Sequence, residues 1–233
     1  MLYFLFGTLL AVAETGAQWL KTIDEQATVT TAHMLLDLDV TDSRGNTVSR
    51  KMEIWQAGDH SRLVRLQSPA RLKGVGLLVT QEDNLHLFLP QYPPARRVLN
   101  SDRSDSFLGT DFAVDDLARL TYANHYSAKY LIKEPIGHKL QLNPLDTNDR
   151  RTINLWCDDD GNLLQVEHFS ADGTLVRKLN FSNYKVINGV ELAHDVSVED
   201  VKRKRTTTAR LLSAQINIDL SGELFTLSTL ENP

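Results

Sequence analysis

Short runs of alternating apolar and polar residues, separated by turn sequences, follow one another along most of this chain. The first run spans residues 31–40, where every second residue is apolar, as in a strand with one buried face. Asn188-Gly189 is a strong hairpin signal, and Asp-Gly or Gly-Asp pairs separate other runs. Runs are expected at 31–40, 48–56, 61–67, 74–80, 84–90, 151–157, 162–169, 174–184, 190–199 and 206–218. This order predicts a mainly β protein with about ten or eleven antiparallel strands. The runs do not alternate with helices as in βαβ units, which argues against a doubly wound parallel sheet.

Helical patterns are confined to three short segments, and the chain has no linker or repeat. Helices are expected within 22–32, 111–120 and 223–230. Residues 1–13 form an apolar run of signal-peptide length that ends in Ala11-Val12-Ala13, an A-x-A cleavage sequence, with a second possible cut after Ala17. No Lys or Arg precedes the run, and a buried N-terminal helix is the alternative. We therefore expect a signal peptide at 1–17, one domain at 18–233, and a soluble protein of the periplasm.

Charge and cysteine content exclude several classes of function. The net charge of −5 argues against nucleic-acid binding, which usually requires a positively charged surface. The single cysteine, Cys157, excludes an intrachain disulfide and a thiolate zinc site, and we expect it to be buried. The Asp158–160 run precedes Gly161 and fits a turn better than a calcium loop. No histidine cluster or nucleophile motif occurs, so neither an enzyme nor a metal or cofactor site is expected.

Some strands are apolar on both faces. Leu85, Leu87 and Leu89 face one way while Phe88 faces the other, and Trp55 lies opposite the face of Ile54 and Met52. Such strands must be covered on both faces or must help to enclose a ligand. Periodicity alone does not separate a cavity from a thick core, and it favours the core.

Residues 62–120 contain motifs that resemble the LolA-like outer-membrane lipoprotein-sorting protein family. These motifs are Ser68-Pro69, Lys73-Gly74, Leu77-Leu78-Val79, Leu87 to Pro90, Arg96-Arg97-Val98, Phe107 to Phe112, and Asp115-Asp116-Leu117. The resemblance implies an incomplete antiparallel β-barrel of about eleven strands, with short helices as a lid over an apolar cavity. It also implies a periplasmic carrier or chaperone for a lipidated protein or lipid, with an inner-membrane exporter and an outer-membrane acceptor as possible partners, acting as a monomer.

On this basis we expect two groups of site residues. The ligand-binding group is Trp55, Leu77, Val79, Leu87, Leu89, Phe107 and Phe112. The partner-binding group is Arg96, Arg97, Lys202, Arg203, Lys204 and Arg205. The 202–205 run could bind anionic head groups or an acidic partner, or form a solvated turn. Gly109 predicts a tight turn into a helix capped by Thr110 or Asp111, and this segment could also belong to the lid.

Two other functions remain open. A filled barrel would fit a non-carrier envelope interaction protein or an accessory of an export pump. A lipid enzyme would require a nucleophile and a base that the sequence does not indicate.

Overall fold

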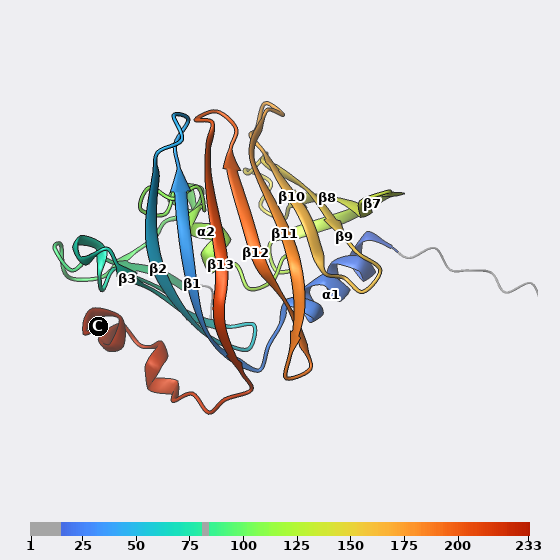
Figure 1. The fold of residues 1–233 in the computed structure, drawn as a ribbon. Helices are drawn as coiled ribbons and strands as arrows, with labels where there is room; N and C mark the ends of the chain where they lie inside the picture. Colours follow the sequence, from blue (N-terminus) through green and yellow to red (C-terminus); the bar gives the residue numbers. More distant parts are fainter. Residues whose placement is uncertain (1–14, 81–83) are drawn as a thin grey trace, which may run out of the picture.

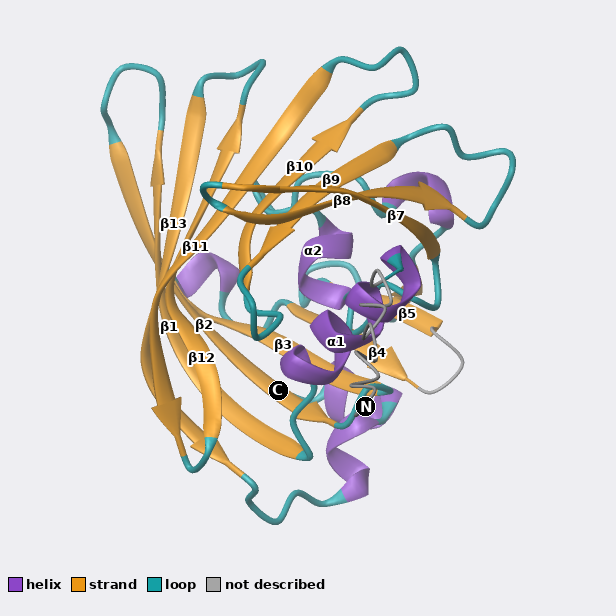
Figure 2. Cartoon of the chain, turned by 90° about the vertical axis from the view of Figure 1, so that its right-hand side faces the viewer, coloured by secondary structure: helices purple, strands orange, loops and turns teal. Residues whose placement is uncertain are grey.

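A computed structural model describes residues 15–80 and 84–233. Within this part of the chain, one antiparallel sheet of thirteen strands curls into an incomplete barrel with helices inside its curve (Figures 1 and 2). The strands are β1 Thr31–Thr41, β2 Thr47–Ala57, β3 Ser61–Ser68, β4 Gly76–Thr80, β5 Asn84–Phe88, β6 Arg96–Arg97, β7 Tyr126–Glu134, β8 Gly137–Pro144, β9 Thr152–Cys157, β10 Leu163–Phe169, β11 Leu175–Ile187, β12 Val190–Asp200 and β13 Arg205–Ile216. The expected fold class, an open antiparallel barrel, is confirmed.

The sheet is built from two meanders that meet at its centre. Its order is β6-β5-β4-β3-β2-β1-β13-β12-β11-β10-β9-β8-β7, so that only the β1–β13 pair joins strands distant in sequence. In that pair Leu38 lies opposite Ala209, and Leu36 lies opposite Leu211 across a bulge. Strands β6 and β7 are left as free edges, and the barrel is therefore not closed.

The ten predicted strands are present, and three more were not expected. These are the short β6 and the β7–β8 hairpin, which falls in a region left without strand assignments. Residues 81–83, between the expected strands at 74–80 and 84–90, lie outside the described residues.

Three short α-helices occur in the described residues: α1 Gly16–Ala27, α2 Val114–Ala118 and α3 Leu227–Glu231. The 3-10 turns η1 Ala70–Leu72, η3 Asn100–Asp102 and η4 Gly222–Phe225 accompany them. Helix α1 begins earlier than expected because Thr15 and Gln18 form a capping box, and it ends earlier because β1 starts at Thr31. No helix among the described residues is long and apolar enough to cross a membrane.

Both faces of the β3–β5 region are covered, which explains their apolar pattern. Val64, Leu77 and Leu85 belong to the main core inside the curve of the sheet. On the opposite face Leu78 and Phe88 pack with Leu230 of α3. The C-terminal segment therefore covers the outer face. Cys157 is fully buried, as expected.

The expected signal peptide falls mostly outside the described residues. Of residues 15–17, which we included in it, Thr15 is the N-cap of α1, and Gly16 and Ala17 are the first residues of the helix. Helix α1 packs on β7, where Trp19 stacks on His138 with 4.0 Å between ring centroids.

Candidate ligand-binding site

Six of the seven expected ligand-binding residues gather in the main core. Leu77, Val79, Phe107 and Phe112 are buried there, and Leu87 and Leu89 pack against them while partly buried. Leu77 and Phe107 are 0 % and 1 % exposed, so that in this structure they are packed core. Trp55 is not with them. It lies on the outer face, beside Leu63 and Leu78, and stacks on His33 at 4.9 Å between ring centroids.

The glycine motif at 107–112 ties the loop between β6 and α2, residues 98–113 (the crossing loop), to the sheet. Gly109 has φ of +75°, which confirms the tight turn. Asp111 accepts hydrogen bonds from Arg205 Nε at 2.6 Å and Thr207 Oγ1 at 2.8 Å, both on β13. Arg50 of β2 donates through Nη1 to the carbonyl oxygen of Leu108 at 2.5 Å. The expected capping role is wrong, because α2 begins only at Val114. The Asp111 carboxylate binds β13 instead, and the Thr110 hydroxyl donates to the carbonyl oxygen of Phe107 at 2.7 Å.

Helix α2 and the loop after it are held by buried polar groups. Arg62 of β3 donates to the carbonyl oxygens of Leu117 and Arg119 at 2.9 and 3.1 Å, and burial lowers its pKa to about 10. Asp24 of α1 accepts from the backbone N–H groups of Tyr122 and Ala123 at 2.7 and 2.8 Å. Burial raises the pKa of Asp24 in spite of these bonds, which favour the charged form. The two helices are thus linked through this loop.

The inner wall continues across the central strands as a row of apolar side chains. Phe181 of β11 lies opposite Val196 of β12, and Val196 lies opposite Ala209 of β13, which pairs with Leu38 of β1. Met34, Leu36, Phe181 and Val196 all pack against the main core, yet each remains partly exposed. Helix α1 packs on β7 and α2 on β4, towards the ends of the sheet. The central wall is therefore apolar and incompletely covered.

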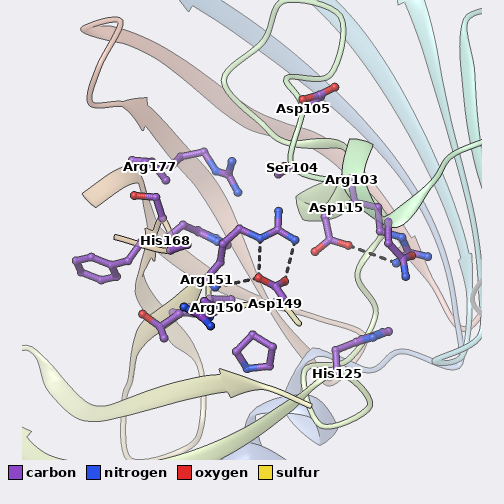
Figure 3. Close-up of a pocket in the computed structure, with 18 of the residues that line it drawn as sticks. Arg103, Ser104, Asp105, Asp115, His125, Asp149, Arg150, Arg151, His168 and Arg177 are labelled. Atoms are coloured by element: carbon purple, nitrogen blue, oxygen red, sulfur yellow. Dashed lines mark hydrogen bonds and ion pairs between the residues drawn. The ribbon is translucent and has the colours of Figure 1, made fainter. Parts of the chain in front are cut away.

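An open cavity of about 1260 Å³ lies where the crossing loop, α2 and the turns of β8 to β12 converge (Figure 3). Seven arginines and lysines line it: Arg103, Arg119, Arg150, Arg151, Arg177, Lys202 and Arg203. Six aspartates also line it, and one of these, Asp111, is neutralised by Arg205 from outside the lining. Tyr126 and Ile153 belong both to the cavity lining and to the main core. The cavity is thus polar at its mouth and adjoins the apolar interior.

Most of the cavity's charges are paired. Arg151 donates through Nε and Nη2 to both carboxylate oxygens of Asp149, at 2.9 and 2.8 Å (Figure 3). Arg177 donates through Nη2 to Asp116 at 2.9 Å. Arg119 pairs with Asp115 and lies over the rings of Tyr122 and Tyr126 at 4.9 and 4.8 Å. These contacts fix the guanidinium groups in place.

His168 lines the cavity beside Arg177, and the buried Asp116 lies behind them. Burial and the positive charges of Arg177, Arg119 and Arg151 hold the pKa of His168 well below its usual value. Asp116 lies 3.6 Å from His168, but it is already bonded to Arg177, and burial raises the pKa of Asp116 itself. We therefore take His168 to be neutral.

The expected partner-binding residues lie in four different environments. Arg96 and Arg97 are exposed on the edge strand β6. Lys202 and Arg203 line the cavity, with Arg203 bonded to Ser106 and Asp200. Lys204 is exposed in the β12–β13 turn, and Arg205 is engaged by Asp111.

Arg119, Arg151 and Arg177 were not predicted, because they come from separate segments and form no local motif. No group of three or more His, Cys, Asp or Glu side chains that could hold a metal ion occurs in residues 15–80 and 84–233.

Three solved structures share this fold over nearly their whole length. One is a domain from Vibrio parahaemolyticus named for outer membrane lipoprotein sorting, with a TM-score of 0.82, 18 % identity, and coverage of 93 % of this chain and 98 % of that one. Another is a DUF1329 family protein from Desulfovibrio piger, with a TM-score of 0.84, 20 % identity, and coverage of 92 % and 97 %. The third is a LolA superfamily protein from Nitrosomonas europaea, with a TM-score of 0.77, 20 % identity, and coverage of 92 % and 98 %.

At these identities the likeness establishes the LolA-like fold. A comparison with curated proteins found no match. A family model described as an uncharacterized protein matches residues 58–232, well over half of the chain. The chain therefore belongs to that family, and its fold is that of the LolA superfamily.

Proposed function

We propose that this protein is a periplasmic carrier that binds the acyl chains of a lipid or a lipidated protein and catalyses no reaction. The observation that carries the proposal is the apolar central wall, where Met34, Leu36, Phe181 and Val196 stay partly exposed inside the curve of the sheet. A closed, self-sufficient core would bury such side chains completely.

The energetics of acyl chains favour a wall of this kind. Each methylene group transferred from water to an apolar surface contributes about 0.8 kcal/mol, so a carrier needs a long apolar surface that is accessible from one side. Helix α1 buries Trp19, Leu20 and Ile23 in the same core. Movement of α1 and the loop it holds would extend the wall, and the burial of these side chains would compete with the ligand and promote its release.

Partners and location belong to the same proposal. The structure named for outer membrane lipoprotein sorting has this fold, and a similar role here would involve an inner-membrane donor and an outer-membrane acceptor. Arg96 and Arg97 on the free edge, and Lys204 in the exposed turn, are available for such contacts.

A pair of neighbouring substitutions tests the carrier function. Val196 faces the wall, and Ser197, the next residue of β12, faces the outside opposite Asn180 and Thr208. Val196→Asp places a carboxylate in the acyl path, and Ser197→Asp is the matched control. Native mass spectrometry with decyl maltoside should show binding to the wild type and to Ser197→Asp, and at least roughly tenfold weaker binding to folded Val196→Asp.

A non-carrier interaction protein is the competing function. The complete burial of Leu77 and Phe107 favours it, because a filled interior leaves only the outer surface for binding. Equal binding of decyl maltoside by both variants, or no binding by the wild type, would support the interaction protein and exclude the carrier function.

A further inference from the structure

Two arginine side chains that line the cavity carry buried donors that nothing in the described chain satisfies. Arg119 Nη1 and Arg177 Nε are buried and have no hydrogen-bond partner. The Arg119 side chain is only 9 % exposed and that of Arg177 13 %. A buried N–H of a charged group without an acceptor is energetically unfavourable, so we expect such donors to meet an acceptor when the site is occupied.

The acidic residues that pair with the cavity's arginines do not meet this need. Asp115 and Asp116 already bind Arg119 and Arg177 through other guanidinium nitrogens. Asp149 is engaged on both oxygens by Arg151. The unsatisfied donors thus remain after the internal ion pairs have formed, and they belong to side chains fixed in place by those pairs.

The charges around His168 indicate the sign of the missing group. Arg119, Arg151 and Arg177 all act on this imidazole and disfavour its protonated form. In Figure 3 the side chains of Arg151 and Arg177 extend into the cavity beside His168. Such a positive, partly dehydrated position is suited to an anion, and the planar guanidinium groups match the oxygens of a phosphate.

The size and surroundings of the cavity indicate the class of ligand. A volume of about 1260 Å³ is far larger than a free inorganic ion requires. Tyr126 and Ile153 connect its lining to the apolar core, so that a molecule held here by its anionic end could direct an acyl chain inwards.

We propose that the cavity formed around Arg119, Arg151 and Arg177 binds the phosphate of an anionic lipid head group, while the acyl chains lie on the apolar wall. The anion site is argued from the unsatisfied arginine donors and the positive charges of the cavity. Its assignment to a lipid head group rests on the proposed carrier function. The ligand class is therefore a phosphate-bearing amphiphile.

The test compares three probes by isothermal titration calorimetry: decyl phosphate, decyl maltoside and inorganic phosphate. The variant is Arg119→Lys/Arg177→Lys, which keeps both charges for Asp115 and Asp116 but removes the two unsatisfied N–H groups. Arg44→Lys, at the exposed tip of the β1–β2 turn, is the matched control, and thermal melting checks the fold of both. We expect the wild type and Arg44→Lys to bind decyl phosphate more tightly than decyl maltoside. The double variant should lose roughly tenfold to hundredfold in decyl phosphate affinity and keep its decyl maltoside affinity.

Other outcomes separate the two proposals. Equal affinity for decyl phosphate and decyl maltoside, unchanged in the double variant, would overturn the anion site and leave the carrier function intact. Equal affinity for decyl phosphate and inorganic phosphate without decyl maltoside binding would overturn the head-group assignment together with the carrier. Failure of all three probes to bind the wild type would overturn both proposals.

Discussion

Gly16, the first residue of α1, lies against the backbone of the edge strand β7. A Cβ atom at this position would meet the carbonyl oxygen of Ala128 at 2.3 Å and the backbone nitrogen of Tyr130 at 2.7 Å. Real Cβ contacts essentially never fall below 3.0 Å, so the helix and the strand must separate by about 0.7 Å in Gly16→Ala. The obstructing atoms belong to the backbone, and no rotamer change relieves the clash.

The magnitude follows from two opposing effects. Overpacking of a close contact costs about 1–3 kcal/mol, while replacing glycine by alanine in a helix gains up to about 1 kcal/mol. We expect Gly16→Ala to lower the free energy of unfolding by about 1–2 kcal/mol. With a urea dependence of about 2–3 kcal/mol per molar, the midpoint should fall by roughly 0.5 M.

Urea titration followed by circular dichroism measures this change. Gly222→Ala is the matched control, because Gly222 also begins a short helical segment and a Cβ there meets nothing within 4 Å. Its stability should remain within about 0.5 kcal/mol of the wild type. A Gly16→Ala protein as stable as the wild type would refute the close docking of α1 on β7.

Three further predictions concern reactivity, pH and export. Burial and nearby carboxylates raise the pKa of Cys157 to about 12, so a thiol reagent at pH 8 should label it only in denaturant; rapid labelling of the native protein would contradict its burial. His168 stays neutral in the fold but gains a proton when unfolded below about pH 6.5, so stability should fall by up to about 1.4 kcal/mol per pH unit between pH 6.5 and 5, as measured by urea titration. His168→Gln should flatten this slope, and an unchanged slope would show that other groups cause it. The capping box of Thr15 and Gln18 leads us to replace the expected boundary at residue 17 by cleavage after Ala13. In a Gram-negative host the intact mass of the processed chain should therefore correspond to residues 14–233, and a chain that starts at Gln18 would contradict this revision.

The strands were predictable where local turn chemistry and alternation agree. Asn188-Gly189 forms the turn between β11 and β12, with Asn188 at φ of +49° and Gly189 at +83°, as a hairpin signal of this type requires. The β7–β8 hairpin was missed because β7 is an edge strand that exposes Leu131 and Ile132 in its C-terminal half. Its alternation of apolar and polar residues is therefore weak. Tertiary position, rather than propensity, decides such a strand.

The apolar interior was partly predictable, and the polar cavity was not. The family motifs located six of the residues that meet in the core, but Trp55 was placed inside because both faces of its strand are apolar. The cavity joins segments far apart in the sequence, from Arg103 to Arg203, so no spacing in the sequence links its arginines. The pairing of β1 with β13 and the crossing loop bring them together, and both are properties of the whole fold.

Photo-crosslinking with an acyl chain tests the central claim most directly. A decyl phosphate analogue with a diazirine near the end of its chain is bound to the protein, and the complex is irradiated. The crosslinked residues are then identified by peptide mass spectrometry. The carrier account predicts crosslinks at the inner wall, to Met34, Leu36, Phe181 or Val196. Crosslinks confined to exposed residues outside the core, such as Val186 and Leu212, or no crosslinks above an unbound control, would contradict it.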